Sequence, residues 1–286
     1  MSKLDIALVQ MRSGIDPAAN IDDAARLIRE AAATGARLVA TPETTHMVQK
    51  DAAKAFERMH LPEEDPAVPA FSALAKELGI VLLIGSLAVR TGGERAANRS
   101  FLFGSDGALL ATYDKAHMFD VGLGKGETYR ESDNYAPGET LVVAEAAGAR
   151  LGLSICYDVR FAYLYRRLAQ AGAQILTVPA AFTRPTGRAH WEVLLRARAI
   201  ETGSYVIAPA QSGLHEDGRK TWGHSMVVGP WGEVVAVRED DEPGVLTATL
   251  DLAKVEEARR RVPALEHDRV LVGPDADGVP GGVTGS

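Results

Sequence analysis

Short apolar segments rich in Val, Ile and Leu alternate along this chain with segments whose apolar residues recur at the helical period. Leu4 to Val9 and Val81 to Leu87 are typical of buried strands, whereas Val68 to Leu78 and Ala189 to Thr202 have helical spacing. Strands and helices that follow one another in this way form layers around sheets, because each covers an apolar face of the other. The alternation therefore predicts an α/β fold.

The 286-residue chain has no internal repeat and no low-complexity linker. We therefore expect one domain over residues 1–272 and a flexible tail over 273–286, where Gly, Asp and Pro replace the hydrophobic period. Acidic residues outnumber basic ones by 38 to 31, which argues against nucleic acid and anionic membranes as partners. No segment approaches about 18 uncharged apolar residues and the N-terminus lacks a signal-peptide pattern, so a cytoplasmic location is expected.

Metal and nucleotide cofactors are not expected from the sequence. Cys156 is the only cysteine, which excludes intrachain disulfides and sites built from several cysteines. His117, His190 and His224 lack the spacing of metal ligands. The segment Gly122 to Gly126 lacks the spacing and the following Ser or Thr of a phosphate-binding loop.

One long segment interrupts the alternation of strands and helices. From Ala116 to Gly138 the hydrophobic period disappears and four glycines occur. We expect a long loop here, and long loops in compact domains are commonly functional.

Three polar side chains follow the ends of expected strands: Glu43, Lys115 and Cys156. Cys156 lies where the expected strand 150–155 runs into a helix that begins near Phe161, and the positive end of that helix would favour the thiolate. A thiolate is a nucleophile, a carboxylate can take up a proton, and an ammonium group can stabilise an oxyanion. Together these groups predict a hydrolase that attacks a carbonyl or nitrile carbon.

Each residue also has a structural interpretation. A lone cysteine after an apolar strand is commonly a small buried hydrophobic side chain. Glu43 and Lys115, taken singly, are equally compatible with solvated loop charges or with structural ion pairs. Composition and spacing alone therefore leave the function open.

Several segments together resemble the nitrilase superfamily of carbon-nitrogen hydrolases, and the resemblance covers nearly the whole chain. Its three central motifs are Thr41-Pro42-Glu43, Tyr113-Asp114-Lys115-Ala116-His117 and Cys156-Tyr157-Asp158-Val159-Arg160-Phe161. The segments 189–201 and 222–228, followed by Pro230-Trp231-Gly232, resemble the Nit subgroup of amidases. This resemblance implies a four-layer α-β-β-α sandwich and dimers formed by helices beside the active site.

The resemblance also implies catalytic roles: Glu43 as general base and acid, Lys115 as oxyanion stabiliser and Cys156 as nucleophile. The backbone N–H of Tyr157 would supply a second oxyanion donor. The family often has a further glutamate in the loop after the lysine, and residues 129–132 resemble that segment. Glu131 is therefore the fourth catalytic candidate.

Glu127 lies near Glu131 in the sequence and is the competing assignment for this further glutamate, although the residues around it match the family less well.

The Nit subgroup implies, as substrate, an amide of a small 2-oxo acid, with deaminated glutathione first and the ω-amidase substrate 2-oxoglutaramate second. Such substrates carry carboxylates, so cations are expected in the site. The expected substrate-binding residues are Tyr157, Arg160, Arg184, Thr186 and Arg188. Arg160 is the first choice among the cations, but it is equally compatible with an ion pair to Asp158 or to a helix carboxylate. Relatives usually have proline where this chain has Arg188, which alters the expected pocket wall.

The expected reaction forms a thioester on Cys156, releases ammonia and then a carboxylic acid, and uses no cofactor. Three alternatives remain open. A nitrilase or an N-carbamoyl amide hydrolase would use the same residues on a different carbon. A binding module would keep the pocket without the chemistry, and a thiol redox sensor would lack the second cysteine that resolves a sulfenic acid.

Overall fold

Two six-stranded sheets form the centre of the structure, a computed structural model that describes residues 3–124 and 127–270. In spatial order, the first sheet contains β16 (Gly244–Asp251), β1 (Lys3–Gln10), β2 (Leu38–Ala40), β3 (Val81–Arg90), β4 (Ala96–Phe103) and β5 (Leu109–Asp114). The second contains β15 (Val234–Val237), β14 (Met226–Val228), β11 (Tyr205–Ala208), β10 (Ile175–Thr177), β9 (Ala149–Gly152) and β8 (Val143–Ala146).

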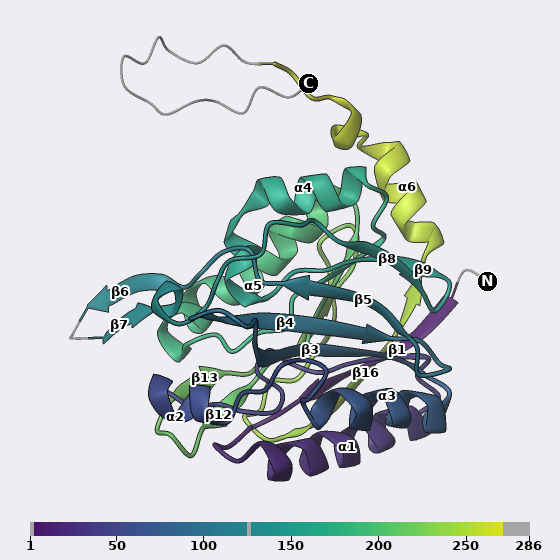
Figure 1. The fold of residues 1–286 in the computed structure, drawn as a ribbon. Helices are drawn as coiled ribbons and strands as arrows, with labels where there is room; N and C mark the ends of the chain where they lie inside the picture. Colours follow the sequence, from purple (N-terminus) through teal and green to yellow (C-terminus); the bar gives the residue numbers. More distant parts are fainter. Residues whose placement is uncertain (1–2, 125–126, 271–286) are drawn as a thin grey trace, which may run out of the picture.

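Helices cover the outer face of each sheet (Figure 1). The first sheet is covered by α1 (Pro17–Ala33) and α3 (Ala67–Leu78), and the second by α4 (Ala162–Gln170) and α5 (Arg184–Thr202). The helix expected over Ala189 to Thr202 begins earlier, at Arg184. The sequence prediction missed this start because the residues from Arg184 to Arg188 carry no apolar period. The order helix, sheet, sheet, helix confirms the expected four-layer sandwich.

The side chains of β1 show why the sheets stack in this way. Leu4, Ile6 and Leu8 belong to the core that includes the second sheet, whereas Ala7 and Val9 belong to the core under α1 and α3. Because successive side chains of a strand point to opposite faces, this one strand contributes to two apolar layers.

Three further elements were not expected from the sequence. The segment expected as a loop over 116–138 contains a hairpin of β6 (Asp120–Gly124) and β7 (Glu127–Arg130), followed by a 3₁₀ turn at Glu131–Asp133. A second hairpin joins β12 (Ser212–Leu214) to β13 (Lys220–Trp222), and α2 (Ala52–Glu57) is a short helix. These elements are short, so their sequences carry little hydrophobic period.

The C-terminal part of the described chain contains α6 (Ala253–Arg261) and a 3₁₀ turn at Ala264–Glu266. The tail expected over 273–286 lies outside the described residues. Over the part that is described, no helix combines the length and the apolar character needed to cross a membrane.

The topology brings Glu43 and Lys115 to one edge of the first sheet. β2 runs parallel to β3, and β5 also runs parallel to β3 because both are antiparallel to β4. The carboxyl ends of β2 and β5 therefore lie at the same edge, and Glu43 and Lys115 follow these two strand ends.

Candidate active site

Glu43, Lys115, Glu131 and Cys156 come from four separate segments and meet around one cavity of about 790 Å³. Lys115 directly follows β5, Glu131 begins the 3₁₀ turn after β7, and Cys156 begins a 3₁₀ helix at Cys156–Arg160. The sequence placed Glu43, Lys115 and Cys156 at strand ends, and the family resemblance added Glu131. The structure brings all four together.

The loop that carries Glu43 is held by hydrogen bonds to the neighbouring strand β3. The hydroxyl of Thr41 accepts a hydrogen bond from the Gly85 amide at 3.0 Å, and the Thr44 amide donates to Ser86 Oγ at 2.8 Å. Gly85 lies so close to this loop that a Cβ atom there would be 2.1 Å from the Thr41 carbonyl oxygen. Only glycine permits this approach, which presses the Glu43 loop onto the sheet edge.

Lys115 lies between two carboxylates. Its ammonium nitrogen is 2.9 Å from Glu43 Oε1 and 2.8 Å from Glu131 Oε2. The lysine side chain is 2% exposed. Asn98 donates from its amide nitrogen to Glu43 Oε1 at 2.9 Å and to Glu131 Oε1 at 3.3 Å, so it bridges the same two carboxylates. The backbone amide of Ala181 donates to the other oxygen of Glu43 at 2.9 Å.

These contacts shift the pKa values of the buried groups. Burial alone would lower the pKa of Lys115, but the charges of Glu131 and Glu43 raise it well above its usual value. Burial raises the pKa of Glu43, yet the charge of Lys115 and hydrogen bonds from Lys115, Cys156 and Asn98 outweigh this effect and lower it. Near neutral pH the cluster therefore contains one ammonium group and an ionised Glu43.

A buried aspartate fixes the thiol segment to the lysine segment. Asp158 accepts hydrogen bonds from the Tyr113 hydroxyl at 2.7 Å and from the His117 amide at 3.0 Å, on either side of Lys115. The same carboxylate accepts from the Ile155 amide at 2.9 Å, directly before Cys156. Asp158 thus holds the sulfur and the ammonium group in a fixed relation.

Cys156 is 7% exposed and has a backbone φ of 49°, a left-handed conformation that is uncommon for residues other than glycine. Its amide donates to the Pro179 carbonyl at 2.9 Å, and its thiol is hydrogen-bonded to Glu43. Residues in such backbone regions cluster at functional sites, where the surrounding structure maintains the strain.

The expectation of a thiolate is wrong. Burial, followed by the negative charge of Glu43, raises the pKa of the Cys156 thiol well above its usual value, and the charge of Lys115 only partly opposes this. The full α-helix begins only at Ala162, and Cys156 precedes it in a short 3₁₀ helix. The resting site therefore has a neutral thiol hydrogen-bonded to a carboxylate.

This protonation state predicts the pH dependence of the thiol. Because the pKa of Cys156 is raised and that of Glu43 is lowered, the pair of thiol and carboxylate persists across neutral pH. The thiolate absorbance near 240 nm, measured as wild type minus Cys156→Ala, is expected to stay flat between about pH 6 and pH 8 and to rise only above the usual range of about 8.5. A rise within the neutral interval would contradict this assignment.

Of the expected substrate-binding residues, only Tyr157 and Thr186 line the cavity. The guanidinium carbon of Arg160 instead lies over the Tyr157 and Phe182 rings, at 5.7 and 5.4 Å from their centroids. Its alternative partner Asp158 accepts hydrogen bonds from other donors, and among the described residues no ion pair joins Arg160 to Asp158.

The other two expected cations also point elsewhere. Arg184 forms an ion pair with Asp241 and donates to the Thr221 carbonyl, and Arg188 is exposed on α5 away from the cavity lining. The cations that do line the cavity, besides Lys115, are Lys50, Arg130, Arg219 and Lys220.

Sequence reasoning missed these cations and also Asn98. Arg219 and Lys220 follow an Asp-Gly pair that reads only as a turn, so nothing in their sequence connects them to the site. Asn98 did leave a signal, because it is a buried polar residue in the apolar strand β4 and its carbonyl accepts from the Lys115 amide at 2.9 Å.

Of the two candidate glutamates, Glu131 is the one whose side-chain contacts the structure describes. Glu131 accepts two hydrogen bonds from Lys115 and one from the Phe119 amide at 2.7 Å. The side chain of Glu127 lies outside the described part of the chain. Among described residues, no group of three His, Cys, Asp or Glu side chains is placed to hold a metal ion.

Comparison with known proteins places this geometry in a family. The deaminated glutathione amidase of Yersinia enterocolitica is 38% identical to this chain, and the match covers 95% of each protein. The omega-amidase NIT2 of Homo sapiens is 35% identical, over 94% of this chain and 96% of the relative.

A solved structure of similar fold is a mutant of the amidase from Nesterenkonia sp. AN1, which shows covalent addition of the acetamide moiety of fluoroacetamide at its active-site cysteine. It is 29% identical, with a TM-score of 0.77, and the match covers 90% of this chain and 94% of that one. The family model described as carbon-nitrogen hydrolase matches residues 5–260. The sequence resemblance is thus confirmed, and the chain belongs to the carbon-nitrogen hydrolase family.

Proposed function

We propose that this protein hydrolyses the amide bond of a small 2-oxo acid, of the deaminated glutathione type, through a thioester on Cys156. The observation that carries the proposal is the buried contact of one thiol, one carboxylate and one ammonium group at a single cavity. Its substrate class is supported by the name of the Yersinia enterocolitica relative, 95% of which is covered by the match.

In the first half-reaction, Glu43 takes the thiol proton while the sulfur of Cys156 attacks the amide carbon. The carbonyl electrons move to oxygen, and the ammonium group of Lys115 and the backbone N–H of Tyr157 stabilise the resulting oxyanion. Collapse of this intermediate breaks the carbon-nitrogen bond. Glu43 returns the proton to the leaving nitrogen, and ammonia departs.

In the second half-reaction, Glu43 takes a proton from water, and the hydroxide attacks the thioester carbon. The same two donors hold the second oxyanion. The carbon-sulfur bond then breaks, the carboxylic acid leaves, and the proton returns to the Cys156 thiol. Glu131 keeps Lys115 positioned through both halves, because Lys115 donates to both of its oxygens.

The cavity rim supplies candidates for recognising the carboxylates of such a substrate. Lys50, Arg130 and Lys220 line the cavity and are exposed. Among the described residues their side chains make no hydrogen bond or ion pair, although the charge of Arg130 contributes to lowering the pKa of Asp120. Arg219 is less available, since its guanidinium lies 2.8 Å from the buried Asp217 carboxylate. We assign the three unpaired cations to substrate binding in place of Arg160, Arg184 and Arg188.

The substrate assignment is tested with an ammonia-release assay on a panel containing deaminated glutathione, 2-oxoglutaramate, a neutral amide, a nitrile and an N-carbamoyl compound. We expect the highest kcat/KM for deaminated glutathione. A second candidate, the ω-amidase reaction on 2-oxoglutaramate, is supported by the relative of that name at 35% identity. A higher kcat/KM for the nitrile or the carbamoyl compound would overturn the amidase proposal.

Replacing Lys50, Arg130 and Lys220 together with alanine is expected to raise KM for the anionic amides at least about tenfold and to change KM for the neutral amide less than about twofold. The matched control replaces Arg188, Lys254 and Arg260, three exposed cations outside the cavity lining, and should leave both KM values unchanged. Equal effects of the two triple variants would remove the rim cations from substrate binding.

We also propose that the enzyme is a cytoplasmic homodimer. The cytoplasm keeps thiols reduced, as the nucleophile requires. Exposed apolar side chains on α5, Val193 and Ile200, support helix packing between copies. Light scattering during gel filtration should give twice the chain mass of 30.5 kDa, and a monomer would contradict the assembly.

A further inference from the structure

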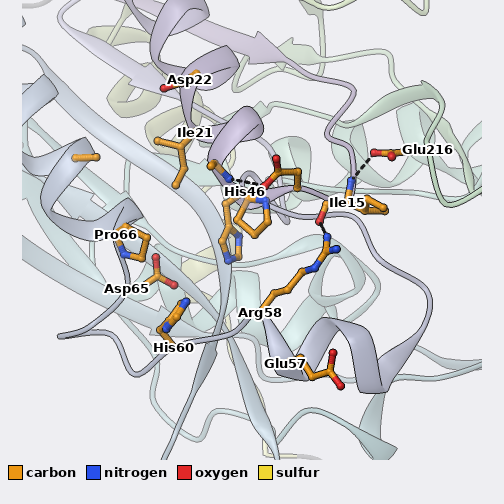
Figure 2. Close-up of a pocket in the computed structure, with 14 residues that line it drawn as sticks. Ile15, Ile21, Asp22, His46, Glu57, Arg58, His60, Asp65, Pro66 and Glu216 are labelled. Atoms are coloured by element: carbon orange, nitrogen blue, oxygen red, sulfur yellow. Dashed lines mark hydrogen bonds between the residues drawn. The ribbon is translucent and has the colours of Figure 1, made fainter.

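A second cavity, of about 910 Å³, lies beside the loop that carries Glu43 (Figure 2). Thr44, Met47 and Val48 of this loop line the active-site cavity, whereas His46 lines the second one. The loop is therefore a shared wall between the two spaces. The remaining wall comes from the start of α1, the segment after α2 and the start of α3.

Two buried side chains in this cavity have polar atoms without a hydrogen bond of normal geometry in the described chain. His46 is 1% exposed, and this holds for both of its ring nitrogens, although the Ala88 backbone and the charge of Asp65 act on the pKa of the ring. Asp65 is also 1% exposed, and although its Oδ1 accepts from the Ala67 amide at 2.9 Å, its Oδ2 has no such partner there. Both side chains point toward the same space in Figure 2. Buried polar groups are nearly always paired, so a ligand is the expected partner.

The charge around the cavity selects the ligand. Its acidic lining residues are Asp16, Asp22, Glu57, Asp65 and Glu216. The one arginine in the lining, Arg58, donates to the backbone carbonyl of Ile15 and not to a carboxylate. This imbalance attracts a cation.

The rest of the wall is apolar and includes Ile21, Pro66 and Ala70. Burial outweighs the charge of Asp65 and lowers the pKa of His46, so the imidazole is neutral and offers one lone pair. A ligand with several N–H donors and an apolar body satisfies all these groups. A metal ion fits less well, because no set of three metal-binding side chains is arranged for it within the described residues.

We propose that this second cavity is a binding site for a small organic primary ammonium compound. Its N–H groups donate to Asp65 Oδ2 and to the lone pair of His46, and its apolar body packs against Ile21 and Pro66. The site is distinct from the amide-hydrolysing cavity, so it does not depend on the function proposed above. His46 belongs to the loop that carries Glu43 and follows it by three positions in the sequence, so a ligand bound at His46 contacts the same loop as the active site.

The proposal is tested by isothermal titration calorimetry with 2-phenylethylamine as the cationic probe and 2-phenylethanol as its neutral counterpart. The protein is first alkylated at Cys156, its only cysteine, with iodoacetamide, which blocks the thiol and places an acetamide group in the active-site cavity. We expect one amine per chain and no detectable binding of the alcohol. Equal binding of the two probes, or binding that alkylation abolishes, would overturn the proposal.

Two variants locate the bound amine. Asp65→Asn keeps an oxygen for the Ala67 amide but removes the charge, and it should weaken amine binding at least about tenfold. His46→Gln is a second, independent variant, and it should weaken amine binding at least about threefold. The control Asp23→Asn makes the same charge change on α1 outside the cavity lining and should alter binding less than about twofold.

Undiminished binding in both Asp65→Asn and His46→Gln would refute the site. A parallel titration with Zn²⁺ alone tests for a metal site. If Zn²⁺ displaces the bound amine at a concentration lower than that of the amine, the cavity binds a metal ion and the proposed organic ammonium ligand is wrong.

Discussion

Ammonia release from every amide substrate disappears when Cys156 is replaced with alanine. The chain has no other thiol, and the buried groups around the sulfur are a carboxylate and an ammonium group that cannot replace it as nucleophile. We expect kcat to fall at least about 10⁴-fold. A coupled ammonia assay at saturating substrate measures this loss.

The fold should survive this substitution, because it removes one small buried atom at a cost of about 1 kcal/mol. Circular dichroism and a thermal melt are the controls. Cys156→Ser should retain the hydrogen bond to Glu43 and yet lose nearly all turnover, since a hydroxyl is a much weaker nucleophile than a thiol. Turnover in the alanine variant above about 1% of wild type would contradict the role of the sulfur.

The second large effect is expected for Lys115→Met, which keeps the length of the side chain but removes its charge. Glu43 and Glu131 then share a buried site without a cation. Breaking a buried ion pair from one side costs about 3–5 kcal/mol of unfolding free energy, and losing an oxyanion donor costs roughly 10² to 10³ in kcat. Urea denaturation and the ammonia assay measure the two losses separately.

The stability loss should depend on pH in a defined direction. In the wild type the pKa of Glu43 is lowered, so its contribution is present above its usual pKa and is lost as the pH falls. In the variant, burial of Glu43 is no longer opposed by the charge of Lys115, so the pKa of Glu43 rises and its protonation relieves the repulsion between the two carboxylates. The difference in unfolding free energy between wild type and variant should therefore shrink as the solution is acidified.

Adding Glu131→Gln to Lys115→Met provides the matched test. This second change removes one of the two uncompensated charges and with it their mutual repulsion, so it should recover part of the stability while activity stays lost. An unchanged urea midpoint in Lys115→Met, or recovery of activity in the double variant, would contradict the electrostatic account.

The layers of the fold follow from sequence patterns that act locally. The apolar period of β1 and β3 and the helical spacing of α3 depend on which faces are buried, and this is visible in each segment alone. The β6–β7 hairpin was missed because its two strands are short and β6 contains two glycines, a residue depleted in strands.

The catalytic candidates could be predicted because each follows a strand end and lies in a family motif. Their protonation states could not be predicted in the same way. The thiolate expectation considered the helix next to Cys156, whereas the pKa depends on burial and on Glu43, which is distant in the chain.

The cations show the same limit. Whether an arginine binds substrate depends on its neighbours in space. Arg184 forms an ion pair with Asp241, and Arg160 lies over two aromatic rings, and neither contact is marked by a local sequence pattern.

The most direct test is rapid acid quenching of the wild-type enzyme during turnover, followed by mass spectrometry of the peptide that contains Cys156. The mechanism predicts a mass increase equal to the substrate minus ammonia, found on this peptide, present only while substrate remains and absent from Cys156→Ala. Steady hydrolysis with an unmodified Cys156 peptide at every quench time would contradict the thioester mechanism.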